Sequence, residues 1–395
     1  MEAVEEVVIV GAGLSGVATA LGLHRKGIKS LVLESSESLR ASGFALTTWT
    51  NAWRALDALG VGDSLRRQSL RLEREIATSA SSGAITSQQI LTTRGKIGEH
   101  EVRCVRRNLL LEALARELPQ GTIRFSSKVV SIEEDGNLKI LHLVDGSILR
   151  AKVLVGCDGV NSLVAKFLGL NKPSFTGRNA SRGFTVFPDG HGFRPRFHQY
   201  FGEGFRCGYL PCDDESIYWF FTWTPSPRDE EVEDAAKMKN FILNKLKTSK
   251  APEQMAQIVS NGEMGTVVSS PLRFRNPFEL LTGNITDGHV CVTGDALHPM
   301  TPDLGQGGCS ALEDGVTLAR CLGEVILNGE RIEGGLMKYA KERRWRSFDL
   351  IVRSYVLGFV QESSGWVMNF LRDKCLAGFL DGQYLKKADF DCGKI

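Results

Sequence analysis

The chain has 395 residues, of which 42% are hydrophobic and 24% charged, as in a globular protein with room for roughly two domains. Its net charge of +2 creates no strong field for nucleic acid or an anionic membrane, and no apolar run approaches the roughly 20 residues that span a bilayer. The nine cysteines form no CxxC pair and no Cys/His cluster with zinc spacing, so we expect reduced thiols and no metal site.

A cytoplasmic location is expected, because the first strand begins about six residues from Met1 and leaves no room for a signal or transit peptide. A targeting segment that had already been removed would leave the same sequence.

The N-terminal segment has the pattern of a dinucleotide-binding unit. Residues 7–10 (VVIV) predict a strand buried on both faces, GAGLSG follows directly, and a helix is expected over 17–26. In such a unit Gly11 makes the tight turn, Gly13 lets a pyrophosphate approach the backbone, and Gly16 lets helix and strand pack closely. The helix N-terminus adds free N–H groups and a partial positive charge for the phosphates.

Glu34 ends the second expected strand, 18 residues beyond Gly16. A carboxylate at this place accepts hydrogen bonds from both hydroxyls of an unphosphorylated ribose, and it disfavours a 2′-phosphate. The unit is therefore predicted to bind FAD or NAD rather than NADP. The alternative is a purely structural glycine turn, which the complete strand–glycine–helix–strand–acid order makes the weaker interpretation.

The following elements do not continue the βαβ pattern of a simple dehydrogenase. A short helix is expected over 51–59, and an amphipathic helix over 103–118, which begins with basic residues that include Arg107.

Residues 126–156 then consist of short alternating strands separated by Asp135-Gly136 and Asp145-Gly146, which are hairpin signals. This pattern predicts a β-meander that returns to a buried strand. Asp158 follows that strand, at the edge where α/β sheets bind ligands.

Residues 176–280 are expected to form a second domain. Within it, 197–223 predicts antiparallel strands, and alternation places Trp219 and Phe221 on one face and Phe220 on the other. Most of the aromatic rings are expected in the core, and the remainder could line an apolar pocket for a flat or conjugated substrate. The predicted substrate contacts are His198, Tyr209, Trp219 and Phe221, with Arg182 and Arg206 as further polar candidates.

Residues 294–314 (GDALHPMTPDLGQGGCSALED) follow an expected strand over 290–293 and lead into an expected helix over 310–321. Asp295 could accept a hydrogen bond from a hydroxyl of a bound ligand, and the following glycines leave the backbone free to approach a flat ring system. A helix N-terminus favours negative charge on such a ring by about 0.3–1 kcal/mol, or up to about 2 when partly buried. Catalysis needs roughly 8 kcal/mol or more, so this interaction tunes the ring and does not catalyse the reaction. His298 and Cys309 are expected to pack within the loop.

Beyond residue 346 apolar side chains recur at helical spacing: Val356, Phe359, Val360, Trp366, Val367, Phe370 and Leu371. We expect a C-terminal helical segment that covers the second domain. The alternative is a helical face that lies on a membrane.

The motifs GAGLSG, RRNLLLEAL, GCDGVNS and GDALHPMTPDLGQGG occur in the order and spacing of the single-component (group A) flavoprotein monooxygenases. The chain resembles most the plant branch that contains zeaxanthin epoxidase and salicylate-hydroxylase-like enzymes. The resemblance implies an α/β fold like that of p-hydroxybenzoate hydroxylase: a Rossmann-like FAD-binding domain with a β-meander insertion, a substrate domain with an antiparallel sheet, and C-terminal helices. The implied ranges are 1–75, 101–175 and 281–345 for the FAD-binding domain, 76–100 and 176–280 for the substrate domain, and 346–395 for the C-terminal helical segment.

The resemblance also implies which residues hold FAD: Gly11, Gly13, Leu14, Ser15, Gly16, Glu34, Ser35, Arg40, Arg107, Val129, Asp158, Asp295, Pro302, Gly305, Gly307 and Gly308. No catalytic side chain can be named, because these motifs all concern the cofactor. Two positions depart from the family pattern. Ala165 and Lys166 stand where an arginine usually follows Asp-Gly-x-x-Ser, and Cys309 stands where aromatic hydroxylases usually have asparagine.

The implied activity is a monooxygenase reaction. NADH or NADPH, bound transiently in a shared groove, would reduce FAD, and a flavin C4a-hydroperoxide formed with O2 would insert one oxygen atom into an aromatic or conjugated apolar molecule. Two alternatives stay open: an epoxidase of a conjugated lipid or polyene, indicated by GQGGC, and a flavin-binding regulatory protein with little or no turnover, indicated by Ala165. The expected partners are the substrate and O2, and nucleic acid is not among them.

Overall fold

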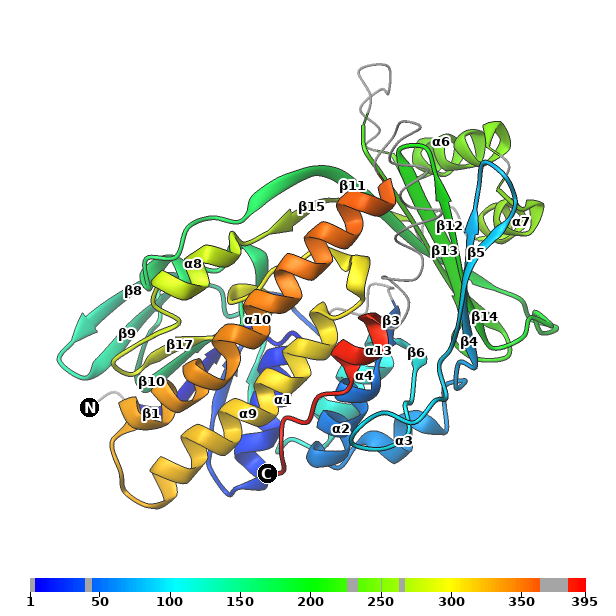
Figure 1. Cartoon of the computed structure of the whole chain (residues 1–395). Helices are drawn as coiled ribbons and strands as arrows, with labels where there is room; N and C mark the ends of the chain where they lie inside the picture. Colours follow the sequence, from blue (N-terminus) through cyan, green and yellow to red (C-terminus); the bar gives the residue numbers. More distant parts are fainter. Residues whose placement is uncertain (1–3, 40–44, 226–233, 250, 263–266, 363–382) are drawn as a thin grey trace.

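The computed structural model describes residues 4–39, 45–225, 234–249, 251–262, 267–362 and 383–395. These residues form two large sheets and a two-stranded one, with helices packed against both large sheets (Figure 1), which confirms the mixed α/β class expected from the sequence. Within the described ranges, no helix combines the length and the apolar character that crossing a membrane requires.

The first sheet carries the predicted nucleotide-binding unit. Its central strands run in the order β16-β17-β10-β1-β2-β7, with β8 and β9 joined beside β10. The bounds are β1 Val4–Val10, β2 Leu31–Leu33, β7 Ile123–Arg124, β8 Val129–Asp135, β9 Leu138–Leu143, β10 Ile148–Gly156, β16 Thr286–Asp287 and β17 Val290–Val292. Strands β1, β10 and β17 are parallel neighbours, so the loops that follow them meet at one edge of the sheet. The antiparallel pairing of β8, β9 and β10 is the predicted β-meander.

Three long helices pack in a row against this sheet (Figure 1): α1 (Leu14–Arg25), α9 (Gly307–Leu327) and α10 (Ile332–Glu362). Helices α1 and α9 approach closely because glycines face small side chains. A Cβ built on Gly315 would lie 2.6 Å from the Cβ of Ala18. Both helices begin at the glycine loops of the sequence motifs, so their packing fixes the two loops relative to each other.

The second sheet has the order β15-β11-β14-β13-β12-β4-β5. Its bounds are β4 Arg74–Ser79, β5 Ile85–Ile90, β11 Ser174–Val186, β12 Arg196–Gly202, β13 Phe205–Pro211, β14 Ser216–Trp223 and β15 Val268–Phe274. Helices α6 (Ala235–Thr248) and α7 (Glu253–Asn261) cover its outer side (Figure 1), where Trp219, Phe221 and Ile242 share a core. Strand β4 crosses the boundary that the sequence predicts between residues 75 and 76.

Other elements differ in part from the sequence expectations. Residues 103–118 do not form one helix: β6 (Arg103–Arg106) pairs with β3 (Ala45–Thr48), and α4 begins at Arg107 and ends at Arg116. The prediction failed here because strand pairing is a tertiary contact that helical periodicity does not reveal.

Helix α2 (Thr50–Leu59) ends at Gly60, which has a φ of 80°, and matches its prediction. The remaining short helices are α3 (Gly62–Arg66), α5 (Leu163–Phe167) and α8 (Pro277–Thr282).

The C-terminal residues turn back onto the first domain. Helix α10 lies along α9 and α8, and α13 (Gln383–Ala388) packs against α2. Arg54 donates a hydrogen bond of 3.0 Å to the carbonyl of Phe390, and its ion pair with Asp389 spans 3.2 Å. The expected contact of this segment with the second domain is made in part, because α10 also packs against β12 and β13 of the second sheet. Trp366, Val367, Phe370 and Leu371 lie outside the described residues.

Candidate functional site

The first glycine loop follows β1 and is shaped by close backbone contacts. Gly11 has a φ of 103°, and a Cβ on it would collide with the carbonyl oxygen of Cys157. A Cβ on Gly16 would collide with the carbonyl of Gly11. At Gly13, by contrast, no heavy atom lies within 4 Å of a built Cβ. The loop is thus tightly packed on one side and open at Gly13, which leaves space for a group that touches the backbone there.

Glu34 borders this open space next to the loop itself. Its carboxylate accepts hydrogen bonds from the backbone N–H of Ala12 at 2.8 Å and of Ser36 at 2.9 Å. Burial alone would raise the pKa of Glu34, but these backbone donors outweigh it and hold the pKa below its ordinary value. The carboxylate is therefore ionised at neutral pH and available to ribose hydroxyls. The surrounding cavity of about 540 Å³ is lined by residues that include Gly11, Gly13, Glu34, Ser35, Val129 and Asp158.

Asp158 has a structural task at the edge of this cavity. Its carboxylate accepts a 2.6 Å hydrogen bond from the N–H of Leu163 and a 2.5 Å bond from the Ser162 hydroxyl. Burial raises the pKa of Asp158. Ser162 in turn caps α5 by accepting from the N–H of Ala165 at 2.8 Å. Ala165, where the sequence departs from the family pattern, therefore lies in the first turn of a helix that Ser162 caps. The effect of this departure on contact with the cofactor stays a prediction.

The second glycine loop follows β17 and leads into α9. Gly294, at a φ of 58°, begins the loop, and Asp295 is exposed while the residues on both sides of it are buried. Gly305 has a φ of 63°, and a Cβ on Gly307 would meet only Met300, at 3.8 Å. Ser15, Asp295, Pro302, Gly305, Gly307 and Gly308 all line a cavity of about 370 Å³.

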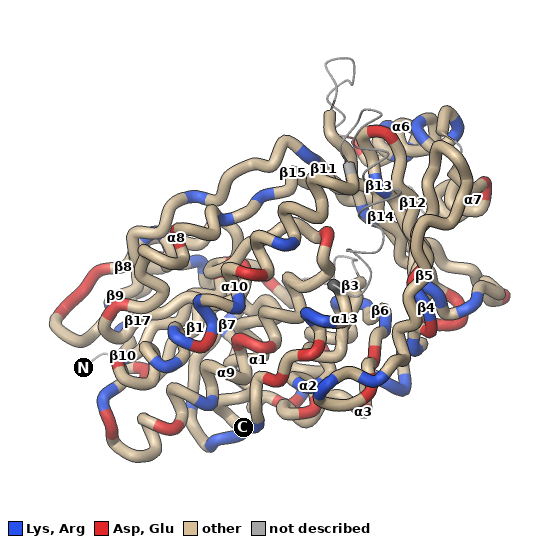
Figure 2. Tube along the Cα trace, in the orientation of Figure 1, with Lys and Arg blue, Asp and Glu red and all other residues tan. Residues whose placement is uncertain are grey.

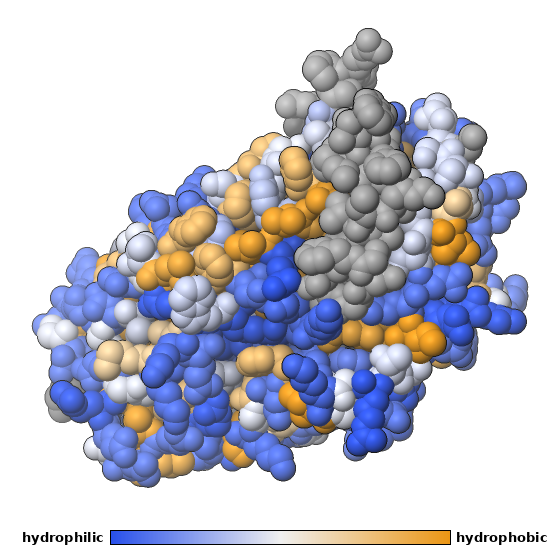
Figure 3. Space-filling model, viewed as in Figure 1, coloured by the Kyte–Doolittle hydropathy of each residue, from blue (hydrophilic) through white to orange (hydrophobic). Residues whose placement is uncertain are grey.

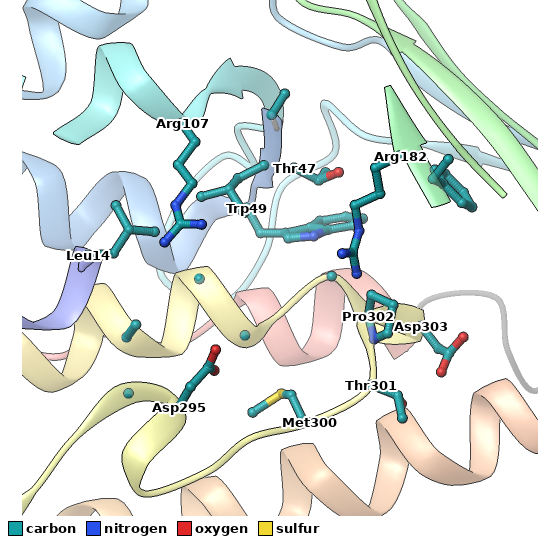
Figure 4. A pocket seen from close by; sticks show the side chains of 18 of the residues that line it. Leu14, Thr47, Trp49, Arg107, Arg182, Asp295, Met300, Thr301, Pro302 and Asp303 are labelled. Atoms are coloured by element: carbon teal, nitrogen blue, oxygen red, sulfur yellow. The ribbon is translucent and has the colours of Figure 1, made fainter. Parts of the chain in front are cut away.

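The two cavities join into one cleft. Gly13, Arg107, Cys157 and Gly159 line both of them. Arg107 and Asp295 extend toward the same space from opposite sides (Figure 4). The loops around Gly13 and Gly307 therefore face a single continuous cleft, as one elongated cofactor requires. Arg40, the other predicted arginine, lies outside the described residues.

A buried network of charges holds the second loop from behind. The Asp314 carboxylate accepts from the Gly294 N–H at 2.7 Å, pairs with the His298 ring at 2.7 Å, and accepts from Arg343 at 2.5 Å. Burial alone would raise the pKa of Asp314, but His298 and Arg343 hold it below its ordinary value. His298 is fully buried in this network, so it positions the loop and does not face the cleft.

A second buried cluster joins the loop to the second sheet. Asp303 is fully buried and forms ion pairs with Arg178 at 2.7 Å and with Arg206 at 3.1 Å. Arg206 also donates to Gln199 on β12 at 2.9 Å. Burial alone would raise the pKa of Asp303, but the two arginines hold it below its ordinary value. The cleft thus has one wall from each domain, joined by this cluster.

The structure corrects the predicted substrate contacts. His198, Tyr209, Trp219 and Phe221 are not among the described residues that line the 370 Å³ cavity. Tyr209, Trp219 and Phe221 belong to the core beneath α6 and α7, and the ring of His198 stacks on Tyr209 at 4.9 Å. Alternation along the strands was predicted correctly, but the helices cover the face that the sequence analysis assigned to substrate.

The opposite face of the second sheet lines the cavity instead, with Phe197, Arg182, Arg206, Tyr218, Phe220 and Thr222. Trp49 and Tyr384 also line it, stacked 5.4 Å apart with an angle of 6° between the rings. Arg182 and Arg206 were among the polar candidates. Trp49 and Tyr384 were missed: Tyr384 lies in a short C-terminal segment, and the one available signal was that Trp49 precedes a predicted helix near the nucleotide-binding unit.

Known proteins share both the sequence and the fold. Residues 5–354 match the protein family described as "FAD binding domain". Monooxygenase 2 of Arabidopsis thaliana is 53% identical over 404 residues, covering 99% of this chain and 98% of the relative. Monooxygenase 1 of the same plant is 36% identical over 407 residues, covering 98% of this chain and 99% of the relative.

The crystal structure of Klebsiella pneumoniae HpxO complexed with FAD and uric acid superposes with a TM-score of 0.83 at 22% identity, covering 98% of this chain and 96% of that chain. At this identity the likeness establishes the fold.

Proposed function

The chain belongs to the FAD-binding-domain family of flavoprotein monooxygenases, and from this premise we propose that it uses NADH or NADPH and O2 to insert one oxygen atom into a flat aromatic or conjugated small molecule. FAD is the cofactor of this family. When bound, it supplies the redox chemistry that activates O2, which amino-acid side chains do not provide.

One observation carries the proposal: the cofactor cleft opens directly onto an aromatic cavity of the second domain. The cavity that holds Asp295 and Gly307 at one end has Phe197, Phe220 and Tyr218 at the other. A substrate seated against these rings would lie beside the part of the cleft that the second glycine loop forms. Such an arrangement brings substrate and cofactor into reacting distance and removes water from between them.

Residues along the cleft suit the successive parts of an FAD molecule. The open space at Gly13 and the nearby N-terminus of α1 suit a pyrophosphate, and the ionised Glu34 suits the adenosine ribose. Asp295 is exposed and directed into the cleft (Figure 4), where it would accept from a ribityl hydroxyl. Gly307 and Gly308 would let the backbone approach the ring system at the N-terminus of α9.

The cavity walls indicate which substrates fit. Trp49, Phe197 and Phe220 present flat apolar surfaces, and Arg182 extends into the same space (Figure 4). The flavin ring would itself occupy part of this cavity of about 370 Å³, so its volume does not measure the space for substrate. The flat rings of the remaining wall favour a planar molecule over a long polyene. The uric acid bound by HpxO is a molecule of this kind.

Rapid mixing of the FAD-loaded protein tests the proposal. Under anaerobic conditions NADH or NADPH should reduce the flavin, and the correct aromatic substrate should accelerate the reduction. With isotopically labelled O2, one labelled oxygen atom should appear in the product. Turnover with polyenes but not with aromatic compounds would favour the epoxidase alternative. Bound FAD that neither nicotinamide reduces, with any ligand tried, would replace the proposal by the regulatory one.

A further inference from the structure

One surface of the molecule has many exposed apolar side chains. Phe278 on α8 is 66% exposed and Trp345 on α10 is 62% exposed. Tyr355 and Val356 on α10 are also exposed. We call the surface formed by Phe278, Trp345, Tyr355 and Val356 the apolar face. Figure 3 shows apolar side chains gathered over α8, the neighbouring part of α10 and β15. Contiguous exposed apolar surface of this kind marks a docking site.

Ring contacts hold the aromatic side chains of the apolar face in two groups. The rings of Trp345 and Phe348 lie 5.6 Å apart, and those of Phe278 and Phe348 lie 5.8 Å apart. Further along α10, Tyr355 stacks on Phe274 of β15 at 4.6 Å. Helix α10 has a second apolar side, where Leu350 and other buried residues pack inward. The core therefore does not account for the outward-facing rings.

Basic side chains surround the apolar face without carboxylate partners. Lys341 lies one helical turn before Trp345, and Arg344 donates to the carbonyls of Leu280 and Gly283 at the end of α8. Among the described residues, Lys341, Arg344 and the neighbouring Lys172 form no ion pair with a carboxylate. The nearby Glu279 and Asp349 are already paired, with Arg275 and Arg353 respectively. Figure 2 shows the basic residues beside α10 and β15.

We propose that the apolar face docks on a lipid bilayer that contains anionic headgroups. Exposed aromatic rings with flanking lysine and arginine match the bilayer interface, where rings enter the headgroup region and cations contact phosphate. A second copy of the chain fits less well, because a two-fold interface would bring Lys341 and Arg344 close to their own counterparts. The net charge of +2 for the whole chain does not reveal the attraction to anionic headgroups, because that attraction acts only over the short distance between the headgroups and the basic residues beside the apolar face.

Helix α10 carries part of the apolar face on its exposed side, and its buried side contacts the wall of the cleft. The hydroxyl of the fully buried Ser354 on α10 lies 3.9 Å from the sulfur of Met300, which lines the 370 Å³ cavity. Docking would hold that cavity one helix away from the bilayer, in which an apolar substrate would be dissolved. This last step rests on the proposed function, whereas docking itself does not.

Vesicle binding by the full chain with bound FAD tests the proposal without any turnover. Co-sedimentation is measured with phosphatidylcholine vesicles and with vesicles that also contain roughly 30 mol% phosphatidylserine. The protein should bind the mixed vesicles more strongly than the neutral ones, and high salt should weaken binding. Trp345→Glu and Phe278→Glu should each lower the partition coefficient about tenfold or more, because a ring no longer enters the interface.

The matched control is Val144→Glu. Val144 is 63% exposed on the connection between β9 and β10, in a different part of the molecule. This variant should bind vesicles within about twofold of the parent, and all three variants should keep the flavin spectrum and the thermal midpoint.

Absence of binding to both kinds of vesicle at low salt would overturn the proposal, and so would equal losses in the control and the two test variants. A dimer detected by light scattering that Trp345→Glu dissociates would assign the apolar face to a second copy of the chain instead. Loss of monooxygenase activity with intact vesicle binding would count against the proposed function alone.

Discussion

Gly11 and Gly13 belong to the same turn, but Gly11 is closely surrounded by other atoms, whereas Gly13 borders open space. A side chain at Gly11 has no room beside Cys157, and its φ of 103° disfavours any other residue. A side chain at Gly13 meets nothing within 4 Å. The first glycine is therefore required by the fold, whereas the second borders open space that the proposed cofactor would enter.

Gly11→Ala and Gly13→Ala should consequently have different effects. Gly11→Ala should lower the free energy of unfolding of the apoprotein by at least about 1–3 kcal/mol, because backbone strain and a steric clash act together. Gly13→Ala should leave apoprotein stability within about 0.5–1 kcal/mol of the parent and weaken FAD binding about tenfold or more. Chemical denaturation and titration of the apoprotein with FAD measure the two quantities. Equal FAD affinity in Gly13→Ala and the parent would contradict the assignment of the pyrophosphate site.

Glu313 illustrates a buried carboxylate that depends on its cations. It is fully buried and pairs with Arg343 at 2.7 Å and with Arg346 at 2.8 Å. Burial alone would raise its pKa, but the two arginines lower it to about 2 from an ordinary 4.5. Because the folded state has the lower pKa, the stabilisation is complete above pH 4.5 and is lost as the pH falls toward about 2.

Glu313→Gln should lower the free energy of unfolding at pH 7 by about 3–5 kcal/mol, because it removes the negative charge that two buried guanidinium groups share and leaves Asp314 as the remaining carboxylate partner of Arg343. The loss should shrink in acid, where the parent also protonates Glu313. Denaturant titrations at several pH values measure this. Glu342→Gln is the control, since its ion pair with Arg320 is partly exposed and contributes at most about 1 kcal/mol. Similar losses in the two variants would show that the buried network contributes little.

Strand β14 presents two faces with different tasks. Phe220 faces the cleft and Phe221 faces the core beneath α6 and α7. The two rings are adjacent in sequence and of identical size. The roles of the two rings therefore depend on what packs against each face of the sheet, because the alternation of side chains does not show which face the helices cover.

Phe221→Ala should destabilise the protein by about 3–5 kcal/mol and leave ligand affinity nearly unchanged, because it opens a void in the core. Phe220→Ala should cost less stability and weaken ligand binding about tenfold or more, because the ring lines the cavity. Thermal unfolding and perturbation of the flavin spectrum by aromatic ligands separate the two effects. Weaker ligand binding in Phe221→Ala than in Phe220→Ala would reverse the assignment of the two faces.

At the level of the molecule, the cleft depends on both domains. Asp303 joins the loop before α9 to Arg178 and Arg206 of the second sheet, and Tyr384 brings the C-terminal segment to the same cavity. Anything bound in the cleft thus contacts residues far apart in the chain. Binding should therefore stabilise the two domains together.

FAD at about 100 times its Kd should raise the free energy of unfolding by about 2.7 kcal/mol in a single shared transition. Calorimetry of the apoprotein with increasing FAD measures this, and Gly13→Ala should need correspondingly more FAD for the same shift. Two separate transitions, of which FAD moves one only, would show that the second domain does not depend on an occupied cleft.

Much of the first domain could be predicted from the sequence. The glycine loop, Glu34, the β-meander and the start of α9 were found because each is encoded within a few tens of residues by turn chemistry and periodicity. The split of residues 103–118 into β6 and α4 was not found, because β6 owes its conformation to pairing with β3, more than fifty residues earlier. The placement of Arg107 in both cavities follows from the position of α4 in the fold.

Short-range information in the chain was enough to identify two glycine loops, the preference of the first loop for FAD or NAD over NADP, and the alternation of the aromatic strands. The choice of FAD came from the resemblance to a known family. Folding was needed to show that the two loops share one cleft, that Phe220 and not Phe221 faces it, and that Trp49 and Tyr384 complete its wall. The physical reason is the range of the interactions. A turn or a helix start depends on neighbouring dihedral angles, whereas the buried side of a sheet depends on which distant helix packs against it.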